Sequence, residues 1–283
     1  MHPAWIVAGV TFLTLIAAAA FRSTTSVMFV PLETEFAWTR TQTSAAVTLN
    51  LIFYGLTAPF AAVLMEKYSI KKVALAALGL IGLGTVLTVW MTSLWQLVLY
   101  WGVLVGAGTG GLALVFASIV ANRWFVKRRG LVTGVFSAAY ATGQLVFLPL
   151  IANMVTQLGW RTGSLVVAGF VAAVIPIFIL FFKNSPEEAN SSAYGSTGTG
   201  ATYTEAPRSL LDTFTVLFEV AKTRQFWVLS GTFFVCGWTT NGLIGAHFIP
   251  AAHDHGMPAT TAAGLLAIVG IFDFVGTILS GWL

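Results

Sequence analysis

Two charged residues lie inside long apolar runs, where an unpaired charge is costly. Arg22 stands in the run from Trp5 to Pro31, roughly 25 Å along a helix from Trp5. A central Arg costs roughly 2.5–3.5 kcal/mol to insert into a bilayer, so it usually faces a cavity or a partner. Its planar guanidinium can bind both oxygens of a carboxylate, which predicts a site for an organic anion. A structural salt bridge, or extension of the side chain to the membrane surface, is the alternative.

Asp273 is the second charged residue of this kind, near the middle of the last apolar run. A carboxylate in hydrocarbon tends to take up a proton or to pair with a cation, which suits a group that carries protons. An ion pair between Arg22 and Asp273 that an anionic solute opens is a further hypothesis. A purely structural contact is the alternative.

Several other polar side chains in the apolar runs are candidates for binding or coupling. Each is more often a contact between helices than a ligand. His247 is the better proton carrier, because His titrates near neutral pH without perturbation. The candidates are Asn50, Tyr54, Gln144, Asn241 and His247.

Two patterns resemble other kinds of site but fit them poorly. His253-Asp254-His255 has no further ligand beside it, so we expect no metal site. The glycine-rich stretch 106–111 lies inside an apolar run with no strand before it, which predicts close helix packing rather than a dinucleotide loop. The apolar runs contain neither HExxH nor a Ser/Lys pair, so we expect no catalytic residues, no enzyme activity and no cofactor.

The composition is that of an integral membrane protein. Of the 283 residues, 57% are hydrophobic and 8% are charged, with a mean hydropathy of +0.85. Soluble domains carry about 25% charged residues. The net charge of +4 comes from cations gathered in a few loops, so we expect no nucleic-acid partner. The predicted fold class is an all-α bundle of transmembrane helices.

Eight apolar runs approach the length of about 20 residues that a helix needs to cross a bilayer. Residues 1–182 would form a six-helix bundle, 183–222 a cytoplasmic linker, and 223–283 the start of a second bundle. Within the linker, 210–221 predict an amphipathic surface helix. Because the chain stops where the eighth run ends, we expect a fragment of a longer protein. The expected helices are 5–31, 42–65, 73–91, 95–121, 131–155, 162–182, 226–250 and 260–283.

Lys and Arg are distributed unevenly among the loops. Most of the 14 follow the even-numbered runs, whereas the odd-numbered loops hold Arg40 and Arg161. By the positive-inside rule, the basic loops and the N-terminus lie in the cytoplasm. We expect the first two basic loops to take part in gating, and Lys127, Arg128 and Arg129 of the second to contact acidic lipid or carboxylates at the cytoplasmic face. Their charged residues are Glu66, Lys67, Lys71, Lys72, Arg123, Lys127, Arg128 and Arg129.

These loops resemble those of a known family. Residues 62–72 (AVLMEKYSIKK) resemble the G-x-L-(A/S)-D-R-(F/Y)-G-R-R loop of the major facilitator superfamily, with Ala62 and Ser69 in place of its glycines. Residues 123–134 (RWFVKRRGLVTG) resemble the monocarboxylate and oxalate/formate branch, although Thr277 stands where the monocarboxylate carriers have an Arg. The acidic residue that begins their first helix is also missing from this chain.

The resemblance implies twelve helices in two halves, of which this chain would hold eight, and transport by alternating access. With Arg22, it predicts a secondary active transporter of a small organic anion, such as a mono- or dicarboxylate, by proton symport or anion exchange. The expected partners are this solute, membrane lipid and a coupling proton, and the expected form is a monomer in a bacterial inner membrane. A sensor that uses the transporter fold, or a carrier of a solute other than a carboxylate, is the alternative.

Overall fold

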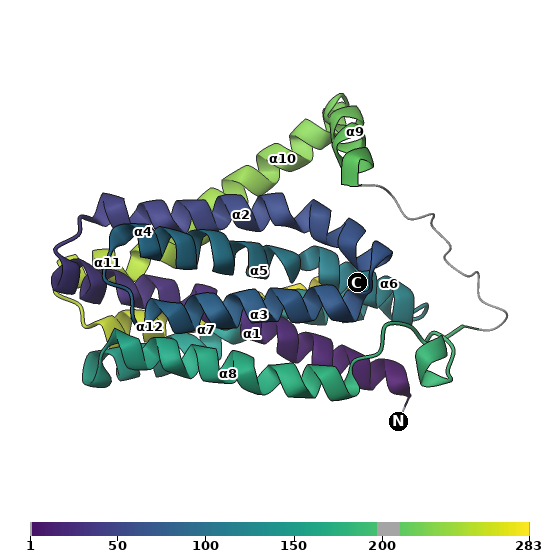
Figure 1. Cartoon of the computed structure of the whole chain (residues 1–283), viewed down its shortest axis with the longest axis horizontal. Helices are drawn as coiled ribbons and strands as arrows, with labels where there is room; N and C mark the ends of the chain where they lie inside the picture. Colours follow the sequence, from purple (N-terminus) through teal and green to yellow (C-terminus); the bar gives the residue numbers. More distant parts are fainter. Residues whose placement is uncertain (1, 197–209, 283) are drawn as a thin grey trace.

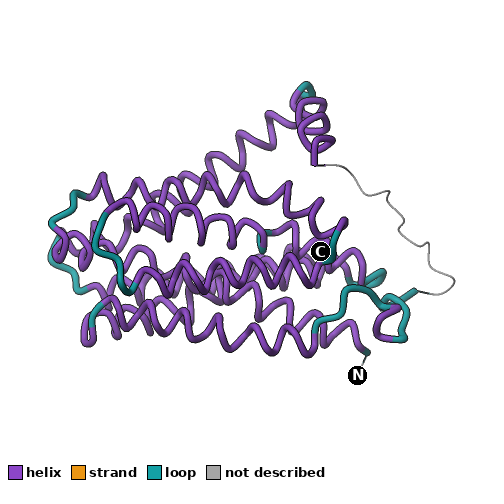
Figure 2. Tube along the Cα trace, in the orientation of Figure 1, coloured by secondary structure: helices purple, strands orange, loops and turns teal. Residues whose placement is uncertain are grey.

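The computed structural model describes residues 2–196 and 210–282, and the side chains of all but a few of them. The described part is a bundle of long helices that lie side by side (Figures 1 and 2). Within it, the only β-type pairing is an isolated parallel bridge between Phe125 and Tyr194. The all-α architecture expected from the sequence is confirmed.

Five of the first six membrane crossings are long single helices, and α2 and α3 begin at residues whose side chains cap them. Thr39 caps α2 by accepting a hydrogen bond from the Gln42 amide, and Ser69 caps α3 by accepting one from the Lys72 amide. Chain reversal after α1 occurs at Ala37, which has a φ of 53°. The long helices of the first six crossings are α1 (Pro3–Phe36), α2 (Arg40–Lys67), α3 (Ile70–Thr88), α7 (Arg129–Leu158) and α8 (Trp160–Phe181).

The fourth crossing is divided, although the sequence predicted one helix over 95–121. A π-helical stretch interrupts it, and a break follows at Leu112 and Ala113. Glycines are poor helix formers, and five of them lie in this crossing, so close packing rather than propensity decides its path. Its pieces are α4 (Leu94–Leu97), η1 (Val98–Val105), α5 (Gly106–Gly111) and α6 (Leu114–Trp124).

The second half begins after the described part of the linker. The expected run 226–250 is helical but is again divided by a π-helical stretch. Among the residues that the structure describes, seven other helices, including the divided fourth crossing, are long and apolar enough to span a membrane. The predicted amphipathic helix 210–221 is present as α9. The elements are α9 (Leu210–Ala221), α10 (Arg224–Cys236), η3 (Gly237–Ala246), α11 (His247–Asp254) and α12 (Ala259–Trp282).

The two ends of the bundle differ in charge. The basic end carries the loops around Lys71 and Arg123, both of which contact Asn184: the Lys71 amide donates to its side chain at 2.9 Å and the Arg123 guanidinium to its carbonyl at 3.3 Å. The opposite end carries Arg40 and Arg161. The loops therefore separate by charge as the sequence predicted, with the N-terminus at the basic end (Figure 1).

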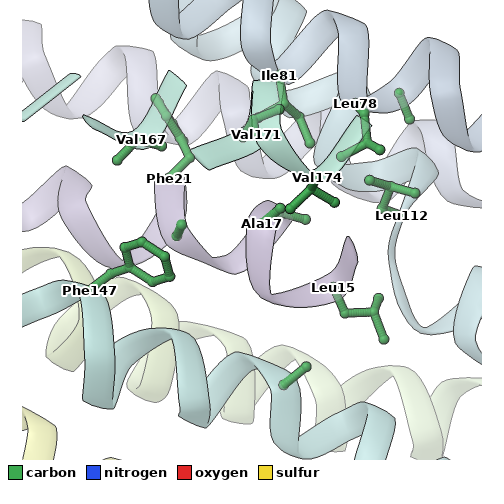
Figure 3. Close-up of a cluster of buried hydrophobic side chains, with 14 of the residues drawn as sticks. Leu15, Ala17, Phe21, Leu78, Ile81, Leu112, Phe147, Val167, Val171 and Val174 are labelled. Carbon is green, nitrogen blue, oxygen red and sulfur yellow. The ribbon is translucent and has the colours of Figure 1, made fainter. Parts of the chain in front are cut away.

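The core lies among α1, α3, α7 and α8. Leu15, Ala17 and Phe21 of α1 pack with aliphatic side chains of α3 and α8, and Phe147 of α7 closes the cluster (Figure 3). The outward faces remain apolar: Leu83 and Leu180 are exposed. Apolar residues both inside and outside are what a helix bundle in lipid requires.

The first part of the linker packs against the basic end of the first half. The Tyr194 amide donates to the Trp124 carbonyl at 2.8 Å, and the Tyr194 carbonyl accepts from Val126 and Lys127. The Tyr194 ring lies 5.5 Å from Trp5 and 5.4 Å from His2. Residues 182–196 are therefore anchored to the first half.

Candidate functional site

A small cavity lies where the two halves meet in the interior of the bundle. Its volume is about 30 Å³, which is room for one or two water molecules. The first half supplies most of its wall and η3 of the second half supplies the rest. It is lined by Phe21, Arg22 and Thr25 of α1, Val47, Asn50 and Leu51 of α2, Trp101 of η1, and Gly245 and Ala246 of η3.

Arg22 faces this cavity, as its position in the apolar run predicted. Its guanidinium carbon lies 4.5 Å from the centre of the Tyr54 ring, a cation–π distance. The guanidinium therefore lies over the Tyr54 ring. Arg22 and Tyr54, two predicted site residues, are thus brought together by α1 and α2.

Asn50 supports the wall of the cavity by holding Trp101 in place. The Asn50 side-chain amide donates to the Trp101 carbonyl at 2.6 Å, and the Trp101 indole N–H donates to Thr88 Oγ1 at 3.1 Å. Asn50, Trp101 and Thr88 are all buried, and the Trp101 ring packs edge-on against Phe21 at 5.5 Å. Asn50 therefore positions the site, and its amide is already engaged by the protein.

The glycines of the fourth crossing let α2 approach this site closely. A Cβ at Gly106 would lie 2.8 Å from the Asn50 carbonyl oxygen, and one at Gly110 would lie 2.5 Å from that of Tyr54. Only a residue without a side chain fits there. The packing role predicted for these glycines is confirmed, and its effect is to place Asn50 and Tyr54 at the cavity.

Two π-helical stretches meet at the same cavity, one from each half. η1 contributes Trp101, and η3 contributes Gly245 and Ala246. A π-helix is a costly conformation that is found disproportionately at functional sites. Periodicity in the sequence does not reveal it, so Trp101, Gly245 and Ala246 were not among the predicted site residues.

Two other predicted candidates, Asp273 and His247, are not among the residues that line this cavity. Asp273 is exposed on α12, where its carboxylate accepts a hydrogen bond from Thr277 Oγ1 at 3.2 Å. His247 is half-buried at the start of α11, with its ring 5.9 Å from that of Phe29. Gln144 lies in α7 and Asn241 in η3, and their side chains fall outside the described part of the structure.

The charged residues of the first basic loop differ in what they contact. Lys71 donates through its ammonium group to the Ile179 and Phe182 carbonyls, at 2.6 and 3.1 Å, at the end of α8. Lys67 lies over the neighbouring Tyr68 ring, and Lys72 contributes its amide to the Ser69 cap. Glu66 is exposed and forms no ion pair with the residues described here.

The second basic loop is organised around the linker. Arg129 donates from Nε to the Phe125 carbonyl at 3.1 Å. Arg128 has a φ of 62° and begins α7, and the stem of Lys127 packs on Gly195. The same segment of the linker holds Glu187, whose pKa is lowered by hydrogen bonds from the Ser185 side chain and from its own backbone, and further by the charge of Arg123.

The two halves touch at both ends of the bundle. At the basic end, α7 and α12 touch through backbone: a Cβ at Gly134 would lie 2.8 Å from the Thr277 carbonyl oxygen, and one at Gly281 would lie 2.5 Å from that of Gly130. At the opposite end, Arg40 of α2 pairs with Asp254 of α11 at 2.6 Å. The two halves are therefore in contact at both ends of the bundle.

Comparison with known proteins places the chain. The model of the Major Facilitator Superfamily matches residues 11–283. Mouse monocarboxylate transporter 12 is 26% identical over 99% of this chain and 60% of its own length, and the uncharacterised MFS-type transporter YcxA of Bacillus subtilis is 23% identical over 99% of this chain and 64% of its own length.

A solved structure agrees with this at the level of the fold. The crystal structure of a D-xylose-proton symporter superposes with a TM-score of 0.68 at 14% identity, covering 97% of this chain and 67% of the symporter. The chain spans about three fifths of the length of the first relatives it matches. With its helical architecture and its multi-pass apolar spans, the chain belongs to the major facilitator superfamily.

Proposed function

We propose that this chain forms the solute site of a secondary active transporter that moves a small organic anion by alternating access. The observation that carries the proposal is the position of Arg22. It is a cation inside a membrane-spanning helix, and it faces a cavity to which both halves contribute. Such a group is retained at a cost, and binding an anion is the use that its chemistry favours.

The ligand that fits this environment is a carboxylate. Arg binds a carboxylate through two parallel N–H···O bonds, and its planar guanidinium can also lie over an aromatic ring, as Arg22 lies over Tyr54. The Trp101 and Phe21 rings supply an apolar wall for the rest of a small molecule. The name of the mouse relative, a monocarboxylate transporter, supports the same ligand class.

The size of the cavity indicates how transport would proceed. A volume of about 30 Å³ is too small for an organic acid, so a solute enters only when η3 moves away from α1 and α2. The two halves touch at both ends of the bundle, so in this mechanism each end would open in turn. In this mechanism Arg22 is exposed to one side and then to the other.

Sidedness and coupling complete the proposal. The basic end would face the cytoplasm of a bacterial inner membrane, because basic loops are retained on that side. A coupling proton, if the carrier is a symporter, would be carried by His247 or Asp273; in an exchanger a second anion would take its place. Gln144 and Asn241 remain candidates for contacts with the solute. Membrane lipid remains the candidate partner of the basic loops.

The test is uptake by the full-length protein reconstituted into liposomes. Radiolabelled mono- and dicarboxylates would be compared with their neutral amides, in wild type, Arg22→Lys, Arg22→Gln and Arg161→Gln. Arg161 is the matched control, because it is an Arg near a Trp ring but lies at the opposite end, away from the cavity. Monodispersity of each variant on gel filtration shows that it is folded.

We expect carboxylate uptake, little uptake of amides, loss in Arg22→Gln, partial loss in Arg22→Lys and no loss in Arg161→Gln. Uptake that survives Arg22→Gln would remove Arg22 from the site. Equal uptake of acids and amides would reject an anionic solute. Saturable binding of an acid without flux would identify a sensor and reject the carrier.

A further inference from the structure

Arg40, at the end of the bundle opposite the basic loops, lies between two carboxylates from different halves. Its Nη1 donates to Asp254 Oδ2 at 2.6 Å, and its Nη2 reaches Asp254 Oδ1 at 3.4 Å. The other side of the same fork contacts Glu33 of α1, with Nε to Oε1 and Nη2 to Oε2 both at 3.3 Å. Arg40 thus has one partner in its own half and one in the other.

We propose that Arg40 is a gating residue: its pairing with Asp254 holds this end of the carrier closed, and Glu33 keeps the Arg40 charge paired when the end opens. The inference deepens the proposed transport cycle and rests on it. It also explains two stretches of sequence that the solute site leaves unused, the turn that contains Arg40 and the His253-Asp254-His255 sequence.

The positions of the three residues support this role. Arg40 is the first residue of α2 and Asp254 the last of α11, so the pair spans the boundary between the halves at their rim. Directly below, the Phe29 ring of α1 lies 5.9 Å from His247 of α11. Separation of α11 from α1 and α2 would break the contact to Asp254 and leave the contact to Glu33 unchanged, because α1 and α2 belong to one half.

The charge state of the pair supports it as well. Asp254 lies beyond the expected crossing 226–250, and the hydrogen bond from Arg40 lowers its pKa, with the Arg40 charge and then His253 and His255 contributing in the same direction. Asp254 is therefore a carboxylate at neutral pH. An Arg–carboxylate pair with two N–H···O contacts is among the stronger side-chain interactions.

The expected size of the effect is modest. The Arg40 and Asp254 side chains are 35% and 50% exposed, and exposed pairs shift an equilibrium by about twofold to fivefold. Such a bias is useful in a gate, because a stronger pair would hold the carrier closed. Glu33 lowers the cost of opening further, since Arg40 never loses its last partner.

A second ion pair at the same end provides a matched control. Arg161 contacts Glu35 at 2.7 Å, and both residues belong to the first half. Glu35 also accepts from the Trp160 indole at 2.7 Å, and Arg161 donates to the Val89 carbonyl. Arg161→Gln, like Arg40→Gln, removes one positive charge from a partly exposed ion pair at this end of the bundle. Unlike Arg40→Gln, it breaks no contact between the halves.

The experiment measures opening directly and needs no solute. A cysteine replaces Val47, which lines the cavity on the Arg40 side, in the full-length protein in nanodiscs, in which Cys236 and every other native cysteine have been replaced by Ser. The rate of alkylation by a membrane-impermeant maleimide is compared in Arg40→Gln, Asp254→Asn, Glu33→Gln and Arg161→Gln. A second reporter, Ser137→Cys in α7 near the basic end, detects opening at that end or general loosening.

We expect Arg40→Gln and Asp254→Asn to raise the alkylation rate of the Val47→Cys reporter about twofold to fivefold, with no rise for the Ser137→Cys reporter. Glu33→Gln and Arg161→Gln should leave the Val47→Cys rate at or below that of the reporter without further substitution. The double variant Arg40→Asp with Asp254→Arg should return it toward that value. A rise in Arg161→Gln equal to that in Arg40→Gln, or no rescue by the double variant, would overturn the proposal.

Because alkylation does not depend on transport, these results are separate from the uptake test. If Arg40→Gln left the alkylation rate unchanged while uptake still depended on Arg22, only the gate would be rejected. If Arg40→Gln raised the alkylation rate but the protein transported no solute, the Arg40–Asp254 gate would stand and the proposed transport function would be rejected.

Discussion

Replacing Gly134 with Ala should force α7 and α12 apart at the basic end. The added Cβ would lie 2.8 Å from the Thr277 carbonyl oxygen and 3.2 Å from the Gly281 Cα, whereas ordinary contacts begin at 3.4 Å. The opposing atoms are backbone, so no side chain can rotate away. The helices must separate by about 0.6 Å, and overpacking of this kind costs about 1–3 kcal/mol.

That cost falls on the closed arrangement of the basic end. In an arrangement where α7 and α12 have already separated, the methyl group would meet no backbone. The equilibrium between the arrangement with α7 and α12 in contact and the arrangement with them separated should therefore shift by roughly 5- to 150-fold toward separation. Alkylation of the Ser137→Cys reporter, which lines the groove between the two helices, measures this shift.

Gly276 provides the control on the same pair of helices. It lies in α12, and a Cβ there would meet nothing within 4 Å. Gly276→Ala should leave the alkylation rate of the Ser137→Cys reporter unchanged and should stabilise the helix slightly, because Ala is the better helix former by about 1 kcal/mol. If Gly134→Ala and Gly276→Ala gave the same rate, the contact between α7 and α12 would not be what closes this end.

Three further predictions concern other parts of the molecule. Thr88→Val removes the acceptor of the buried Trp101 indole N–H and should lower the free energy of unfolding by about 1–3 kcal/mol, measured by denaturant titration in micelles; the exposed Thr48→Val should change it little. Gly106→Ala places a methyl group 2.8 Å from the Asn50 carbonyl oxygen and should cost about 1–3 kcal/mol, whereas Gly9→Ala, in open space within α1, should not destabilise. Arg40 lowers the pKa of Asp254 below its ordinary 3.8, so the pair persists above that lowered pKa and is lost only as the pH falls through it. The alkylation rate of the Val47→Cys reporter, corrected for the pH dependence of the thiol itself, should therefore be the same at pH 7 and pH 5. A rise at pH 5 would contradict this assignment.

The sequence was sufficient for the parts of the fold that depend on hydrocarbon length and charge. The runs around Arg22 and Asp273 are helices, and the loops holding Lys71 and Arg123 lie at one end as predicted. A single cation in an apolar run also led to the cavity, because its cost in lipid leaves few other places for it. Asn50 and Tyr54 were predicted as polar side chains in an apolar run, and both lie on α2 beside Arg22 or its cavity.

Other parts depend on contacts between distant residues and could not be predicted in this way. Asp254 looked like part of a weak metal pattern, and only the fold brings Arg40 to it, 214 positions away in the chain. The linker was expected to begin at 183, but Tyr194 pairs with the backbone at Trp124. These contacts are set by tertiary geometry, which local composition does not encode.

The π-helical stretch η1 has a consequence for how relatives are aligned with this chain. Each π turn holds about one residue more than an α turn, so residues after Val105 are rotated relative to an uninterrupted helix. Suppose that the fourth crossing of a relative is entirely α-helical. An alignment without a gap near 98–105 can then match residues on the same helix face before the π-helical stretch, at Trp101, or after it, at the later glycines, but not at both. At 23–26% identity, a single-residue gap in this stretch is the correction that restores both faces at once.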